Sequence, residues 1–209
     1  MTKVKICGLT DPDLVRHAAQ EGADWVGFVL VEASPRYVTG AAAANLLLQA
    51  GGATPVALLA DPDDALVDCV ASIGFPVLQL HGQETPHRVA GIKARTGAEI
   101  WKAVGVSEIG DLADTRKYEA ADRFLIDAKP PEGANRAGGH GRAFDWTILR
   151  DWQPIRPWIL AGGLTPDNVA EAIHLTCAPA VDVSSGVEGA PGRKDRAKVS
   201  AFIRIAKNS

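Results

Sequence analysis

The chain has few cysteines and no long apolar run, and each of these absences excludes a class of protein. Its three cysteines, Cys7, Cys69 and Cys177, are odd in number and show no CxxC spacing, so we expect free thiols rather than a disulfide framework or a zinc site. No stretch approaches the roughly 18 apolar residues that a membrane-spanning helix needs. Lys3 and Lys5 interrupt the opening MTKVKICG, where a signal peptide would have its apolar core. We therefore expect a cytoplasmic protein with no membrane partner.

The chain also lacks a dense basic run. Its 22 Lys and Arg residues stand against 25 Asp and Glu residues, which gives a net charge of -3. A surface that neutralises a phosphate backbone is missing, so we expect no nucleic-acid partner. A chain of 209 residues that is 46% hydrophobic fits one globular domain, and we expect residues 1–209 to form it. The sequence carries no signal of oligomeric state, and a monomer is the simpler expectation.

Short apolar runs recur at intervals of roughly 26 residues along the chain. There are eight of them: VKICGL, WVGFVL, PVALLA, VLQLH, EIWKAVGV, RFLIDA, PWILAGGL and AVDVSSG. Strands that are apolar along most of their length are buried on both faces, as in a parallel sheet covered by helices. The runs therefore predict strands of an α/β protein.

Helix-like segments lie between the runs, and several have a recognisable start. A capping residue followed by proline precedes the helices that we predict over 13–22, 63–74 and 168–175. Strand and helix alternate eight times and use the whole chain, which predicts a closed (β/α)8 barrel, the TIM barrel. An open doubly wound sheet would need fewer strands, and no G-x-G-x-x-G follows the first strand.

The longest irregular stretch is AKPPEGANRAGGHGRA, residues 128–143, after the sixth predicted strand. A loop of this length in a compact domain is usually functional or disordered. A surface excursion without function is one interpretation. We favour a lid over the barrel mouth, because active sites of this fold lie on the face to which the loop belongs.

Side chains and turns that can do chemistry stand directly after several predicted strands, where the active sites of such barrels lie. In chain order they are Cys7, Arg36, His81, Asp127, Gly162, Gly163, Ser185 and Gly186, and Asp182 lies inside the last run. The turns after strands seven and eight often bind phosphate in these barrels through backbone N–H groups. Two adjacent glycine-containing turns favour such a phosphate site here over the alternative that the glycines only form tight turns.

Cys7 and Asp127 are predicted to face each other across the mouth, with room for a small sugar phosphate between them. A thiolate can accept a proton and a carboxylic acid can donate one, so the pair suits proton transfer without metal or cofactor. This requires neighbouring N–H groups or cations around Cys7 and partial desolvation of Asp127. We interpret Cys69 and Cys177, which lie in or after a helical segment, as small buried apolar residues.

Seven motifs follow one another along nearly the whole chain: KICGLT, SPRYV, QLHG, FLIDA, GGHGRAFDW, AGGLTPDNV and VDVSSGVEGAPGRKD. In this order they resemble the phosphoribosylanthranilate isomerases of tryptophan biosynthesis. That family converts N-(5'-phosphoribosyl)anthranilate to 1-(2-carboxyphenylamino)-1-deoxyribulose 5-phosphate by an Amadori rearrangement. A shared series of this length is far more specific than any single motif.

The resemblance implies a role for each candidate. It makes Cys7 the general base and Asp127 the general acid, and it puts Arg36 near the anthranilate carboxylate of the substrate. It implies phosphate binding at Gly162, Gly163, Ser185 and Gly186, with His81 and Asp182 in supporting roles. One departure is His140, which stands where the family usually has a small hydroxyl residue in a GGTG or GGSG loop, and we interpret it as a solvated side chain.

Three other barrel types remain as alternatives. An aminoaldose isomerase of histidine biosynthesis would use two aspartates, whereas position 7 is a cysteine. Barrels of the indole-glycerol-phosphate synthase or tryptophan synthase α type would need a lysine and glutamates at inner strand ends, and Lys102 is the one late strand lysine. A barrel that binds phosphate without catalysis needs no acid–base pair, and it would bind substrate without turning it over.

Overall fold

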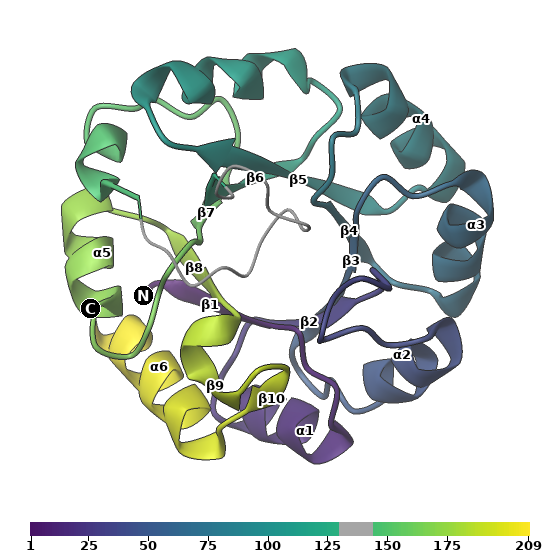
Figure 1. The fold of residues 1–209 in the computed structure, drawn as a ribbon, viewed down its shortest axis with the longest axis horizontal. Helices are drawn as coiled ribbons and strands as arrows, with labels where there is room; N and C mark the ends of the chain where they lie inside the picture. The colour runs from purple at the N-terminus through teal and green to yellow at the C-terminus, as the bar shows by residue number, and fades with distance from the viewer. Residues whose placement is uncertain (130–143) are drawn as a thin grey trace.

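The computed structural model of the chain describes residues 1–129 and 144–209, and in it the eight predicted strands close into one parallel barrel (Figure 1). The strands are β1 (Lys3–Cys7), β2 (Trp25–Val29), β3 (Thr54–Leu59), β4 (Val77–Leu80), β5 (Glu99–Val106), β6 (Arg123–Ala128), β7 (Trp158–Leu160) and β8 (Ala180–Val183). β8 pairs with β1 and completes the ring. The predicted TIM-barrel fold is therefore confirmed.

Helices surround the barrel (Figure 1). The α-helices are α1 (Pro12–Gln20), α2 (Gly40–Leu47), α3 (Asp64–Ile73), α4 (Pro86–Thr96), α5 (Val169–Thr176) and α6 (Arg196–Asn208). The described segments after β5 and β6 hold 3-10 helices instead, η1 (Ile109–Lys117) and η2 (Trp146–Leu149), and a third, η3 (Ser185–Val187), follows β8. A short hairpin of β9 (Glu188–Ala190) and β10 (Arg193–Lys194) comes after η3, and no sequence signal was assigned to it.

The predicted start of α1 agrees with the structure, whereas that of α3 does not. Asp11 caps α1 by accepting a hydrogen bond from the N–H of Asp13, with Pro12 at the first helical position, as predicted. α3 begins later than the Asp61-Pro62 pair suggests, because Asp63 is its capping residue and accepts from the N–H of Leu66. The predicted helix boundaries are otherwise close to those of the structure.

The inside of the barrel is apolar at the end where the strands begin. Trp25 and Trp101 lie edge to face there, with ring centroids 5.2 Å apart, and the guanidinium of Arg123 lies 5.2 Å from each ring. Side chains alternate along each strand between the barrel interior and the helices, so Val4 and Ile6 belong to the outer core while Lys5 and Cys7 share the other face of β1. Large side chains fill the barrel where the strands begin, so the polar groups lie at the end where the strands finish.

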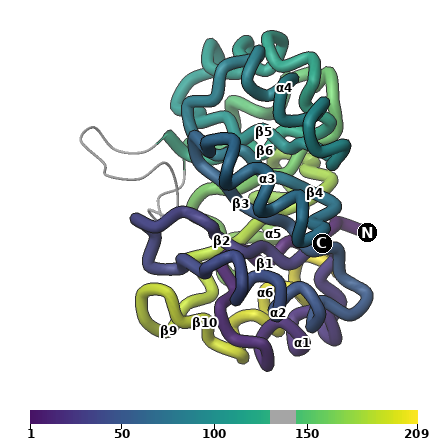
Figure 2. The backbone as a smooth tube through the Cα atoms, turned by 90° about the vertical axis from the view of Figure 1, so that its right-hand side faces the viewer, coloured from purple at the N-terminus to yellow at the C-terminus, as the bar shows by residue number. Residues whose placement is uncertain are grey.

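Both chain ends lie on one side of the molecule, away from the β9–β10 hairpin (Figure 2). Among the helices of the described residues, none is both long and apolar enough to span a bilayer. The predicted lid over 128–143, including His140, falls almost entirely outside the described residues, so it stays a prediction.

Candidate active site

Cys7 is the last residue of β1 and is only 3% exposed. In the register of the barrel it stands opposite Gly27 of β2. A Cβ atom built on Gly27 would lie 3.0 Å from the Cys7 Sγ and 3.2 Å from the Lys5 Nζ. The thiol and the ammonium group thus both lie against the bare backbone of Gly27, where a Cβ would crowd them.

Lys5 is completely buried, and its Nζ donates to Asp182 Oδ1 at 3.0 Å. The two residues stand side by side in the register of β1 and β8. Burial alone would lower the pKa of Lys5, but the charges of Asp182 and of the Cys7 thiolate outweigh it and raise this pKa. Lys5 is therefore a permanent cation inside the barrel, and the sequence analysis did not single it out.

The pKa of the Cys7 thiol is raised, because burial disfavours the thiolate more strongly than its surroundings favour it. Lys5 opposes this rise by its charge and by hydrogen bonding, and Lys194 opposes it by charge, while Asp182 adds to it. The predicted cations beside Cys7 are therefore present. Burial nevertheless dominates, so the pKa of the thiol stays above its ordinary value.

Arg36 is buried and makes a two-pronged ion pair with Glu188 of β9. Its Nε lies 2.6 Å from Oε1 and its Nη2 lies 3.0 Å from Oε2 of that glutamate. The Nη1 group makes no hydrogen bond with the described residues. Lys194 Nζ also donates to Glu188 Oε1 at 2.9 Å and to the carbonyl of Ser184 at 2.9 Å. Burial opposes ionisation of Glu188, yet the hydrogen bonds from Arg36 and Lys194 keep its pKa below the ordinary value.

Gly8 leaves room for the Arg36 side chain at the end of β1. Its φ of +74° favours glycine, and a Cβ atom there would lie 2.4 Å from Arg36 Cδ and 3.2 Å from Ser184 Oγ. The Arg36 side chain therefore crosses directly over the residue that follows Cys7. The turn after β1, the loop after β2 and the loop after β8 meet at this point.

Asp127, the second-last residue of β6, is 9% exposed and is held by two hydrogen-bonding partners. Its Oδ1 accepts from the N–H of Ala128 at 2.8 Å, and its Oδ2 lies 3.2 Å from His81 Nε2. Gln79 Nε2 lies 3.0 Å from His81 Nδ1, so both ring nitrogens of His81 have a polar neighbour. Each carboxylate oxygen keeps a further lone pair for a proton.

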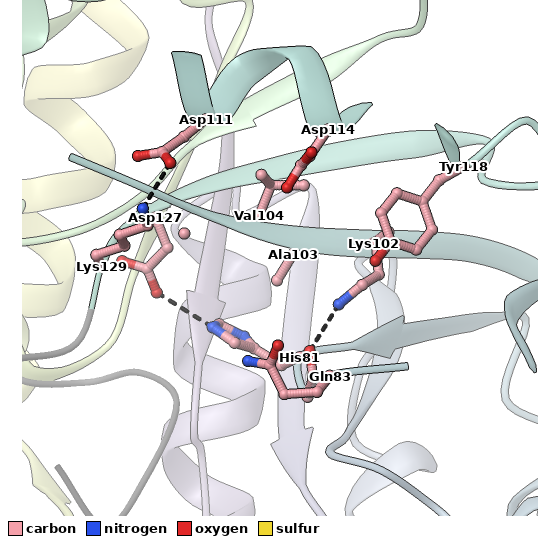
Figure 3. Close-up of a pocket in the computed structure, with 12 residues that line it drawn as sticks. His81, Gln83, Lys102, Ala103, Val104, Asp111, Asp114, Tyr118, Asp127 and Lys129 are labelled. Carbon is pink, nitrogen blue, oxygen red and sulfur yellow. Dashed lines mark hydrogen bonds and ion pairs between the residues drawn. The ribbon is translucent and has the colours of Figure 1, made fainter. Parts of the chain in front are cut away.

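A cavity of about 220 Å³ opens beside Asp127 and His81 (Figure 3). Two ion pairs contribute charged groups to its wall. Lys129 Nζ lies 2.5 Å from Asp111 Oδ1, and Lys102 Nζ lies 2.9 Å from Glu84 Oε2. Burial would raise the pKa of Asp111, but hydrogen bonds from Lys129, Ser107 and Glu108 lower it to about 2. Asp111 is thus ionised at neutral pH and cannot act as an acid there.

The loops after β7 and β8 pack tightly against their neighbours. Gly162 and Gly163 have φ values of +85° and +68°, which favour glycine, and a Cβ on Gly162 would lie 2.6 Å from the Ala128 nitrogen. A Cβ on Gly186 would lie 1.8 Å from the carbonyl oxygen of Leu164, so only glycine fits. Ser185 and Gly186 open η3, and the first N–H groups of a helical turn have no partner within it.

The structure gathers the predicted site residues at one end of the barrel, in two groups. Cys7 and Arg36 lie beside β1, and His81 and Asp127 lie beside β4 and β6. Asp182 is also there, but it is buried against Lys5 rather than open to the mouth. Lys5, Glu188, Lys194 and Gln79 are the neighbours that the sequence analysis missed.

The other two cysteines are free thiols, as predicted, but both are exposed. The interpretation of Cys69 and Cys177 as buried apolar residues is therefore wrong. Cys69 lies on the outer face of α3, and Cys177 ends α5 with a φ of +51°. Only Cys7 among the three is buried.

Comparison with known proteins agrees with the motif series. The family model described as N-(5'phosphoribosyl)anthranilate (PRA) isomerase matches residues 4–205. The N-(5'-phosphoribosyl)anthranilate isomerase of Hyphomonas neptunium is 62% identical over 209 residues, which cover 100% of this chain and 99% of the relative. The enzyme of Paracoccus denitrificans is 54% identical over 97% of this chain and 96% of its own length.

Solved structures give the same result. The phosphoribosyl anthranilate isomerase of Thermotoga maritima superposes with a TM-score of 0.89 at 34% identity, over 100% of both chains. A phosphoribosyl anthranilate isomerase in complex with reduced 1-(o-carboxyphenylamino)-1-deoxyribulose 5-phosphate superposes with a TM-score of 0.85 at 33% identity, again over 100% of both chains. This chain belongs to the N-(5'-phosphoribosyl)anthranilate isomerase family.

Proposed function

We propose that this enzyme isomerises N-(5'-phosphoribosyl)anthranilate to 1-(2-carboxyphenylamino)-1-deoxyribulose 5-phosphate in tryptophan biosynthesis, with Cys7 as general base and Asp127 as general acid. The whole chain, residues 1–209, acts as one domain in this proposal. The observation that carries it is the placement of a thiol and a carboxyl group at the carboxyl ends of β1 and β6, two strands separated by β7 and β8 in a barrel of this family.

In the first step, Asp127 donates its proton to the furanose ring oxygen, and the C1'–O bond breaks to give an open-chain Schiff base. His81 Nε2 and the Ala128 N–H hold the Asp127 carboxyl group in position for this transfer. The Cys7 thiolate then removes the proton from C2', which gives an enolamine. Ketonisation yields the product. The cycle is complete when Cys7 has lost its proton again and Asp127 has regained one.

The substrate carries two anionic groups, and the proposal assigns each a partner. Arg36 Nη1, which bonds to none of the described residues, can donate to the anthranilate carboxylate, while the pair with Glu188 fixes the guanidinium plane. The backbone N–H groups of Gly163, Ser185 and Gly186 would bind the phosphate at the loops after β7 and β8. Gly162 supports this site by letting its loop approach Asp127, since a Cβ there would lie 2.9 Å from Asp127 Oδ1.

The test is the turnover of freshly generated phosphoribosylanthranilate, followed through the loss of anthranilate fluorescence. The wild-type enzyme should consume it. Cys7→Ser should lower kcat by about 10²–10⁴-fold, because a hydroxyl group is a far weaker base than a thiolate. Cys69→Ser is the matched control, since that thiol is exposed on α3, and it should leave kcat unchanged.

Two outcomes would contradict the proposal. Binding of the substrate without turnover by the wild-type enzyme would favour a barrel that only binds phosphate. Near-normal turnover by Cys7→Ser would remove Cys7 from the chemical step.

A further inference from the structure

Lys5 lies on the same strand face as Cys7, two residues before it, and it is fully buried. Lysine is rarely buried without a partner, because removing its charge from water is costly. Lys5 has one such partner, Asp182, at 3.0 Å. A structural ion pair would be complete with these two groups, but the ammonium and the thiol also lie within 3.2 Å of one point, the position that a Cβ on Gly27 would take.

The charges around Cys7 come from two strands of the barrel and from the hairpin outside it. Lys5 is on β1, Asp182 on β8 and Lys194 on β10, and Lys194 is mostly compensated by its contact with Glu188. Arg36, which crosses over Gly8, is likewise paired with Glu188. Lys5 is the cation that acts most strongly on the thiol, and Asp182 is its partner in a buried ion pair.

We propose that Lys5 is the positioning residue of the general base: its ammonium, kept protonated by Asp182, is the fixed counter-ion of the Cys7 thiolate. This inference rests on the proposed function for its role in catalysis. Lys5 keeps its proton throughout, while the thiol loses its proton to solvent before the reaction and regains one from C2' during it. Asp182 thus serves the base indirectly, through Lys5, and does not bind the substrate.

The proposal predicts opposite effects for the two members of one ion pair. Without Lys5 the thiolate has no adjacent cation, so the pKa of Cys7 should rise. Without the negative charge of Asp182, Cys7 becomes the anionic partner of Lys5, so the pKa of the thiol should fall. The loss of Lys5 should change the pKa of Cys7 more than the loss of the Asp182 charge, because Lys5 acts on the thiol more strongly than Asp182 does.

The experiment measures the rate of alkylation of Cys7 by iodoacetamide between pH 6 and 10, read by peptide mass spectrometry, with the exposed Cys69 and Cys177 as internal references. In Lys5→Met the rate at pH 7.5 should fall by about 10- to 1000-fold, since a nearby opposite charge shifts a pKa by about 1–3 units. Lys5→Arg should restore much of it. Asp182→Asn should instead speed the reaction. Lys3→Met, on the same strand but exposed, is the matched control and should change nothing.

Lys5→Met leaves Asp182 as a buried lone charge, so thermal unfolding is measured in parallel. If this variant does not fold, Lys5→Met/Asp182→Asn replaces the whole pair, and its Cys7 should still be alkylated more slowly than in wild type. An unchanged rate profile in a folded variant without Lys5, or slower alkylation in Asp182→Asn, would overturn the proposal. The alkylation assay uses no substrate, so its result is independent of whether phosphoribosylanthranilate is turned over.

Discussion

The two sides of the barrel mouth hold their reactive groups in different ways. Around Cys7 the neighbours are ions: Lys5 with Asp182, and Lys194 with Glu188. Around Asp127 the neighbours are a histidine and a backbone N–H, while the charged groups of the adjacent cavity are paired among themselves. A base that must become negatively charged lies among buried ion pairs, and an acid that must hold a proton has no lysine or arginine bound to it among the described residues.

This difference predicts how each side fails. A buried ion pair that loses one partner leaves an uncompensated charge, so changes beside Cys7 should reduce stability as well as rate. Hydrogen bonds to a neutral acid can be replaced at small cost. Changes at Asp127 should therefore reduce rate alone.

The largest effect should come from Asp127→Asn. Asparagine keeps the size of aspartate and can still accept from the Ala128 N–H, but it has no proton to donate to the ring oxygen. Turnover should fall by about 10²–10⁴-fold, with the melting temperature and the affinity for product close to wild type. Retained turnover together with a large loss of stability would instead make Asp127 a structural carboxylate.

The next largest effect should come from Glu188→Gln on the opposite side. It strands Arg36 and Lys194 in a buried site, and breaking such a pair costs about 3–5 kcal/mol of stability. Because Arg36 also loses its fixed orientation, KM should rise more than kcat falls. Chemical denaturation and steady-state kinetics measure both, and a stable variant with unchanged KM would show that the ion pair does not orient Arg36.

Inorganic phosphate or sulfate should inhibit competitively with the substrate. Backbone N–H groups at the loops after β7 and β8 that donate to none of the described residues can bind a bare anion. Initial rates at several anion concentrations give the mode of inhibition, with chloride at equal ionic strength as the control. A purely noncompetitive pattern would move the phosphate site elsewhere in the molecule.

The smallest effect on rate should come from Asp111→Asn, which is the control for Asp127→Asn in the same cavity. The pKa of Asp111 is lowered to about 2, below its ordinary value of 3.8, so it stabilises the folded state above about pH 4 and loses this contribution as the pH falls toward 2. The melting temperature of the variant should be below wild type at pH 6, and the two should converge near pH 2. Turnover that falls as far as in Asp127→Asn would make Asp111 part of the acid machinery.

The sequence predicts the barrel and the positions of Cys7 and Asp127 at the ends of their strands, because strand period and strand-end position are local properties. It did not reveal Lys5, although Lys5 and Cys7 are two residues apart and must share a strand face. That spacing was the available signal, but lysine is usually exposed, and only the closed ring brings Asp182 beside it. The pair of Arg36 and Glu188 joins residues 152 positions apart, which no local pattern encodes.

The helical segments show the same limit. α1 begins where the Asp-Pro signal predicts, because its cap is made by neighbouring residues. The segment after β5, IGDLADTRK, has glycine and aspartates that weaken an α-helix, and it folds as the 3-10 helix η1. The capping and propensity signals of this segment are present in the sequence, but the regular alternation of the other units predicts an α-helix there.

The central claim is that Cys7 is the base, and two pH profiles on the wild-type enzyme test it most directly. The profile of kcat/KM reports the pKa of the essential base in the free enzyme, and the rate of iodoacetamide alkylation reports the pKa of the Cys7 thiol. Because burial raises the pKa of this thiol, kcat/KM should increase as the pH rises above neutral. The account predicts that both profiles rise with the same apparent pKa. A kcat/KM profile that is flat over the range in which Cys7 titrates would contradict it.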